Sequence, residues 1–137
     1  MIQYLTAVTK ESTLAYWSQQ KLKLRPDGDP GGNGWTDPEI VPLVDALNSL
    51  PGIVTLQSCA GHAGYRGHLW IWCDATMARR LEAQRIGLRG VAASWRELND
   101  SERRAVATLS FDGLDVSAEA FSQSASTILN FFRGLTA

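Results

Sequence analysis

The chain has 137 residues, of which 45% are hydrophobic and 20% charged, values typical of one soluble globular domain. The formal net charge of −1 argues against wholesale binding to duplex nucleic acid, which needs a basic field to neutralise many phosphates. No apolar run approaches the ~20 residues of a membrane span, and the N-terminus lacks a secretory signal pattern. We therefore expect a cytoplasmic protein without a membrane partner, whose two cysteines are free thiols.

The first part of the chain predicts one helix followed by a loop. Leu14, Trp17 and Leu24 fall near helical spacing, so residues 1–24 are expected to be helical in their second half. Residues 25–38 are rich in Gly, Pro and Asp, a composition typical of a loop. A plain surface loop is the expectation here, with a lid over a site as the alternative.

A second helix is predicted directly after this loop. Thr36 and Glu39 have the spacing of a capping box, and Asp37 is an alternative cap. Because Pro42 lacks the N–H that an early helical turn requires, the regular helix is expected to begin near Val41.

The rest of the chain predicts four strands and two more helices. In order these are strands at 53–57 and 68–73, a helix from Asp74 to about Arg89, strands at 91–98 and 104–111 joined by a turn at 99–102, and a final helix from Ser117. This order implies an α+β fold, a mostly antiparallel sheet with helices packed on it. We expect one domain over 1–137, with an N-terminal helix and Gly/Asp-rich loop at 1–36 and a core at 37–133.

The connection between the two central strands carries the best candidates for function. It contains Ser58, Cys59, Gly61, His62, Gly64, Tyr65, Arg66, Gly67 and His68. Turn glycines let the backbone approach a ligand closely. The neighbouring side chains can transfer protons, stack on a ring or pair with an anion, so we expect the site here.

Two kinds of catalysis are open for this connection. In one, His62 favours the thiolate of Cys59, which then acts as a nucleophile. In the other, His62 and His68 converge on one phosphate as acid and base. A metal site is not expected. Cys59, His62, His68 and Cys73 are a zinc-compatible set, but their spacing matches no standard module, and Cys73 has the strand parity opposite to His68. Cys73 is instead expected in the core.

Aromatic residues extend the candidate site along the second strand. His68, Trp70 and Trp72 alternate with apolar residues and should share one face of the sheet. A row of this kind is suited to stacking a planar ring. Trp95 and Arg96 on a later strand could add to it, and Arg66 or a later arginine could hold an anion.

The connection between the two central strands, with the segments around it, also resembles a known protein family. Three pieces carry the likeness: the predicted helix before residue 51, Thr55-Leu56-Gln57-Ser58-Cys59-Ala60-Gly61-His62, and Arg66-Gly67-His68-Leu69-Trp70-Ile71. With them the chain resembles the wybutosine-synthesis tRNA methyltransferases over roughly residues 37–133. The family signature is Ser-Ser-Cys-Ser-Gly-Arg-like; here its first serine is Gln57 and its terminal arginine is His62. The resemblance implies use of S-adenosylmethionine, RNA as substrate, and a site loop that includes Ser58, Cys59 and Gly61.

Three functions are therefore predicted. The leading one is binding of a nucleotide-type small molecule between the Ser58–His68 loop and the Trp70/Trp72 strand, to sense, capture or turn over a nucleotide signal. The second is an enzyme, either a methyltransferase or a phosphodiesterase. The third is a protein-interaction domain, such as a homo-oligomer, because tryptophan and arginine are enriched at binding hot spots.

Overall fold

The computed structural model describes residues 10–29, 34–84, 88, 90–97 and 104–136. The elements in chain order are α2 (Lys10–Gln20), the 3-10 helix η1 (Pro38–Ile40), α3 (Val41–Asn48), β1 (Ile53–Cys59), β2 (Gly67–Asp74), α4 (Ala75–Gln84), β3 (Val91–Glu97), β4 (Arg104–Phe111) and α5 (Ala118–Thr136). The four strands form one antiparallel sheet with helices packed on it, which confirms the predicted α+β fold.

The strand order in the sheet is β1-β2-β4-β3, so β1 is an edge strand and β2 lies inside the sheet. Each pair of neighbours is antiparallel, and the register between β1 and β2 shifts between Thr55 and Gln57. Beyond this irregularity, Cys59 lies opposite His68. Opposed residues of an antiparallel pair project to the same face, so the end of β1 and the start of β2 present their side chains together.

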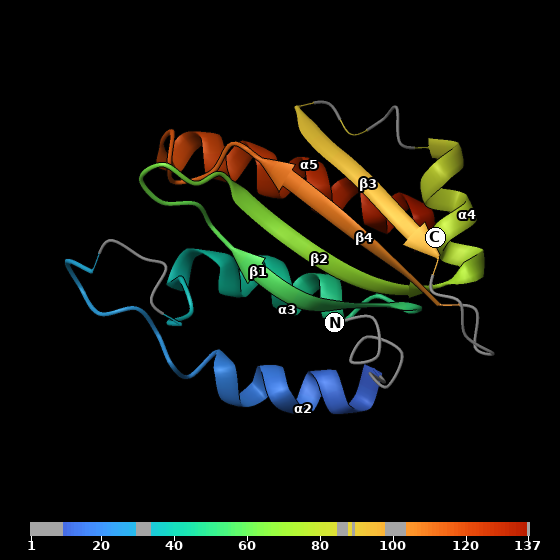
Figure 1. Ribbon diagram of the computed structural model, residues 1–137, viewed down its shortest axis with the longest axis horizontal. Helices are drawn as coiled ribbons and strands as arrows, with labels where there is room; N and C mark the ends of the chain where they lie inside the picture. The colour runs from blue at the N-terminus through green and yellow to red at the C-terminus, as the bar shows by residue number, and fades with distance from the viewer. Residues whose placement is uncertain (1–9, 30–33, 85–87, 89, 98–103, 137) are drawn as a thin grey trace.

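One face of the sheet forms the hydrophobic core with α3, α4 and α5 (Figure 1). The fully buried side chains there include Leu69, Ile71, Cys73, Leu109, Leu47, Leu81, Ile128 and Phe132. Because side chains alternate along a strand, the residues between them project to the second face. Among them are His68, Trp70 and Trp72 on β2, as the alternation predicted.

The N-terminal helix α2 runs alongside β1 and lies beside α3, farther from α4 and α5 (Figure 1). It ends at Gln20, four residues earlier than predicted, because the chain turns and Leu24 makes an isolated bridge with Thr36. The Thr36 hydroxyl donates to the carbonyl of Gln20 at 2.7 Å. The same carbonyl also accepts the N–H of Lys23 at 3.0 Å, so both donors come from residues beyond the end of the helix.

Helix α3 begins at Val41 as predicted, but its predicted caps are used elsewhere. Asp37 precedes η1 without a side-chain cap hydrogen bond. Its carboxylate and that of Glu39 bind Arg25 instead. The capping box is therefore wrong, because these polar groups make long-range contacts rather than local ones. By contrast, the Ser117 hydroxyl accepts the N–H of Ala120 at 2.9 Å and caps α5, at the residue where the final helix was predicted to begin.

Helix α4 covers Ala75–Gln84, and most of the remaining stretch up to the predicted end at Arg89 lies outside the described residues. Residues 1–9 and the predicted turn at 99–102 lie outside the described residues, as do the loop residues 30–33 and the side chain of Trp95. Over the described part of the chain, no helix is long and apolar enough to cross a membrane.

Candidate functional site

A cavity of about 390 Å³ lies between α2, the segment 34–37 and the end of β1. Its lining combines aromatic rings with hydroxyl, amide, thiol and imidazole groups. The residues are Thr13, Tyr16, Trp17, Gln20, Gly34, Trp35, Thr36, Asp37, Thr55, Leu56, Gln57, Ser58, Cys59, His62 and His68. The cavity therefore joins part of the predicted site loop to an N-terminal wall formed by α2 and the segment 34–37, of which the sequence analysis offered only the loop, as an alternative.

Two exposed aromatic residues belong to the N-terminal wall. Tyr16 is 62% exposed and Trp35 is 46% exposed. Trp17 is more buried, and its indole N–H donates to Asp45 of α3 at 2.7 Å, which ties α2 to the core helices. Large aromatic surface left open beside a cavity is suited to stacking on a planar ring. Trp35 could have been noticed in the sequence, because an aromatic residue in a Gly/Asp-rich loop has no strand or helix pattern to bury it.

Both histidines line this cavity. His62 begins a tight turn in which its N–H and carbonyl pair with Tyr65 at 3.0 and 2.8 Å. The two rings lie 4.8 Å apart, so the imidazole packs against the phenol. His68 is half-buried on β2. The structure thus brings together two histidines whose convergence the sequence left open.

Burial lowers the pKa of His68 below the value of a free imidazole, and the nearby His62 lowers it further. The carboxylate of Asp37 acts in the opposite direction, by attraction to the protonated ring. The net effect is that His68 favours its neutral form near pH 7, in which one ring nitrogen can accept a proton.

The environment of Cys59 disfavours the thiolate. Burial raises the pKa of its thiol, and the negative charges of Asp37 and Asp115 raise it further. The N–H of Gly61 donates to the sulfur at 3.4 Å and opposes these effects only in part. Because the thiolate is the nucleophilic form, this arrangement argues against the predicted nucleophilic role of Cys59.

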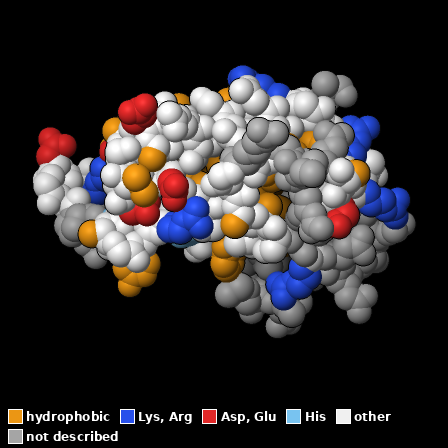
Figure 2. All heavy atoms as spheres, turned by 90° about the horizontal axis from the view of Figure 1, so that it is seen from above, with side chains coloured by type: hydrophobic (Ala, Val, Ile, Leu, Met, Phe, Trp, Pro, Cys, Tyr) orange, Lys and Arg blue, Asp and Glu red, His pale blue; other side chains and the backbone are white. Residues whose placement is uncertain are grey.

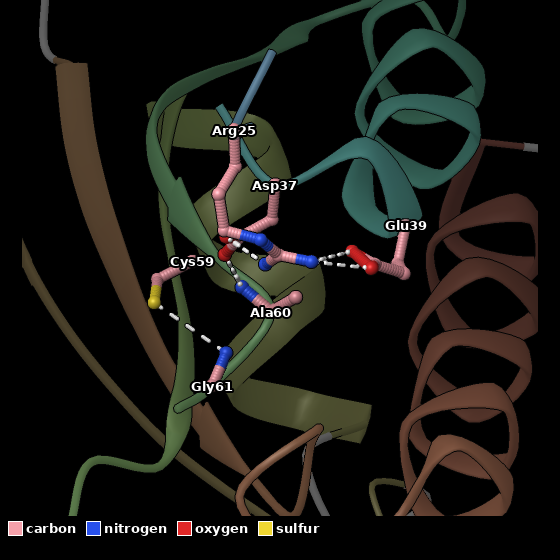
Figure 3. Close-up of polar contacts among 6 residues, drawn as sticks. All are labelled: Arg25, Asp37, Glu39, Cys59, Ala60 and Gly61. Carbon is pink, nitrogen blue, oxygen red and sulfur yellow. Dashed lines mark hydrogen bonds and ion pairs between the residues drawn. The ribbon is translucent and has the colours of Figure 1, made fainter. Parts of the chain in front are cut away.

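A cluster of charged residues fixes the wall formed by residues 34–37 (Figure 3). Arg25 donates to Asp37 at 2.6 Å and to Glu39 at 2.6 and 3.1 Å. The second carboxylate oxygen of Asp37 accepts the N–H of Ala60 at 2.9 Å. The cluster therefore connects the N-terminal segment, the start of η1 and the end of β1, a role that the sequence analysis missed.

Two glycines of the connection, Gly61 and Gly67, serve packing rather than the expected approach to a ligand. Gly61 has φ 97°, and a Cβ there would lie 2.6 Å from a carboxylate oxygen of Asp115. A Cβ on Gly67 would overlap the ring of Phe111. The N–H of Leu114 also donates to the carbonyl of Ala60 at 2.8 Å. These residues are small because the β1–β2 connection lies against the chain that links β4 to α5.

Several predicted site residues lie outside the cavity lining. Tyr65 is 66% exposed, and Arg66 makes an exposed 3.4 Å contact with Asp112. Trp70 and Trp72 are half-buried deeper in the sheet, because β2 is an interior strand while the cavity lies over the β1 edge. Arg96 is exposed on β3, beyond β4. Cys73 is fully buried in the core, as expected.

Positive charge is scarce at the cavity. Among the described residues that line it, the two histidines are the only side chains that can become cations. On the face seen in Figure 2, Lys and Arg side chains lie among Asp and Glu side chains and do not gather into one basic patch. The predicted anion-holding arginine is thus not part of this lining.

Over the described residues, no group of three or more His, Cys, Asp or Glu is placed to hold a metal ion. Cys73 lies on the core face, away from Cys59 and the histidines. The resemblance to the wybutosine methyltransferases stays a prediction from the sequence signature. Comparison of the chain with family models, with curated proteins and with solved structures finds no match.

Proposed function

We propose that the cavity binds a nucleotide-type small molecule through its base. The observation that carries the proposal is the pair of exposed rings, Tyr16 and Trp35, beside a cavity with polar lining. Stacking a base on an aromatic side chain contributes about 1–3 kcal/mol. Gln57 and Ser58 line the same cavity and offer an amide and a hydroxyl to the polar edge of a base.

The scarcity of positively charged side chains in the cavity restricts the class of ligand that it can bind. With no Lys or Arg in the described lining, the cavity suits a nucleobase, a nucleoside or a monophosphate better than a polyphosphate. S-adenosylmethionine contains a nucleoside and a sulfonium cation, and it too fits a cavity poor in positive charge. Methyl transfer to RNA, implied by the family resemblance, is therefore kept as the second candidate.

The experiment is a thermal-shift screen followed by calorimetric titration of the intact protein. The panel holds the four common ribonucleosides, their monophosphates and triphosphates, and S-adenosylmethionine. We expect a ribonucleoside or monophosphate to raise the melting temperature, and Tyr16→Ala and Trp35→Ala each to weaken binding by about 10-fold. Arg66→Ala, at an exposed residue outside the cavity, is the matched control and should bind like the original protein.

Other outcomes would redirect the proposal. A shift with S-adenosylmethionine alone would favour the methyltransferase. A panel without any shift would contradict ligand binding. The exposed Tyr16, Leu22, Leu24 and Trp35 would then favour a protein interface, which sedimentation at several concentrations would detect as a rising mass.

A further inference from the structure

The two histidines in one cavity have a use beyond binding. The geometry points to an acid–base pair, His62 and His68, that cleaves a ribonucleotide phosphodiester through attack of the adjacent 2′-hydroxyl. This inference rests on the proposed function, because the base must be held by Tyr16 and Trp35 for the phosphodiester to reach the histidines.

The backbone that carries each histidine is held by a regular part of the fold. His68 belongs to an interior strand and is paired with Cys59 on one side and Ser110 on the other. His62 is fixed by the two backbone hydrogen bonds to Tyr65 and by the contact with its ring. Two catalytic groups held in place before the substrate arrives avoid much of the entropic cost of bringing them together.

The surroundings assign the two roles. His68 is faced by His62 from the turn, Cys59 from β1 and Asp37 from the segment before η1. The part of α2 that lines the cavity adds only the phenol of Tyr16 as a titratable group. Since burial and His62 keep the pKa of His68 low, His68 is the neutral base and His62, when protonated, is the acid.

The reaction needs no further reactant. His68 removes the proton of the 2′-hydroxyl as its oxygen bonds to phosphorus, and the bond from phosphorus to the 5′-oxygen breaks. His62 gives its proton to that leaving oxygen. The products are a 2′,3′-cyclic phosphate and a free 5′-hydroxyl, and proton exchange with water restores both histidines. Protonated His62 also supplies the positive charge that the described lining otherwise lacks, while Arg25 offsets the charge of Asp37.

The test uses the intact protein with the sixteen diribonucleoside monophosphates in the presence of EDTA. Products are separated by chromatography, and the cyclic phosphate is identified by mass. We expect cleavage with a bell-shaped pH profile, and a loss of about 100-fold or more in His62→Gln and in His68→Gln. Arg96→Ala, exposed on β3 and outside the cavity, should cleave at the original rate.

Three results would overturn the inference. One is equal cleavage by the original protein and by both histidine variants, which indicates a contaminating nuclease. Another is cleavage of the matched deoxyribose dinucleotides, which have no 2′-hydroxyl. The third is a protein that binds a nucleoside in the titration above yet leaves all sixteen substrates intact. In that third case the binding function stands and only the acid–base role fails.

Discussion

Arg25 and Asp37 form an ion pair in which Nη1 and Oδ1 are 2.6 Å apart, and both side chains are largely buried. The other oxygen of the same carboxylate accepts the N–H of Ala60, at the end of β1. One carboxylate therefore satisfies a guanidinium from the N-terminal segment and a backbone donor from the sheet. This single side chain therefore joins the segment 34–37 to the end of β1, which are two walls of the cavity.

Replacing Asp37 by alanine is expected to destabilise the protein strongly. The change leaves Arg25 with only Glu39 and leaves the Ala60 N–H without its acceptor, so we expect a loss of about 3 kcal/mol in the free energy of unfolding. Urea titration measures it. The control is Lys21→Gln, which removes an exposed 3.4 Å pair with Asp45 and should cost less than about 1 kcal/mol. Equal costs for both variants would contradict the role of the buried pair.

A second stability prediction concerns Thr55, which is 5% exposed and whose hydroxyl has no hydrogen-bond partner within the described part of the chain. Thr55→Val keeps the shape and removes a buried polar group, so stability should rise by about 1 kcal/mol. Thr36→Val is the matched comparison, because that hydroxyl donates to the carbonyl of Gln20. It should lower stability by about 1 kcal/mol. Thermal melts of the two variants must therefore move in opposite directions.

Substitutions at two glycines of the β1–β2 connection distinguish the cost of an unfavourable backbone conformation from the cost of a steric clash. Gly61 has φ 97° and Gly64 has φ 82°, but only at Gly61 would a Cβ meet close neighbours, whereas Gly64 faces open space. Gly64→Ala should cost about 1 kcal/mol from its backbone conformation alone. Gly61→Ala should cost clearly more in denaturant titration. If the two losses were the same, the packing against the chain after β4 would not be the reason for a glycine at 61.

The pKa of His68 predicts a dependence of stability on pH. Its pKa in the folded protein is below the 6.5 of a free imidazole, so the unfolded chain binds more protons in this range. The contribution of neutral His68 to the free energy of unfolding is therefore fully present above pH 6.5. This contribution is lost as the pH falls through the pKa of His68 in the folded protein. His68→Gln should flatten the fall between neutral and mildly acidic pH, as seen by urea titration at a series of pH values. An unchanged slope would mean that His68 titrates normally.

The strands β1 and β2 were predictable because each is a short run rich in β-branched or aromatic residues, next to a segment that contains glycine. The alternation of His68, Trp70 and Trp72 with core residues also gave the correct face. The final helix could be recognised from the apolar residues after Ser117, such as Phe121, Ile128 and Phe132. Each of these features depends on residues that are close together in the sequence. They could therefore be predicted from a single amino-acid sequence.

The candidate site was only half predictable, because its second half comes from far away in the chain. Cys59, His62 and His68 stand close together in sequence, between two clear strands. Tyr16 and Trp35 reach them through tertiary contacts, among them those of Arg25 with Asp37 and of Trp17 with Asp45. Asp37 has the local pattern of a helix cap, and nothing in that pattern indicates that its carboxylate binds Arg25 and the end of β1 instead.

The division of the cavity between two parts of the chain has a dynamic consequence. A ligand that contacts both walls binds only when α2 and the segment 34–37 are docked on β1. Its binding free energy therefore stabilises the docked arrangement of these segments. Amide hydrogen exchange should therefore slow in α2 and around Thr36 when ligand is added, and much less in β4. A bound ligand would thus hold α2 and the segment 34–37 on the sheet. The rate at which these two segments separate from β1 would limit the rate of ligand dissociation.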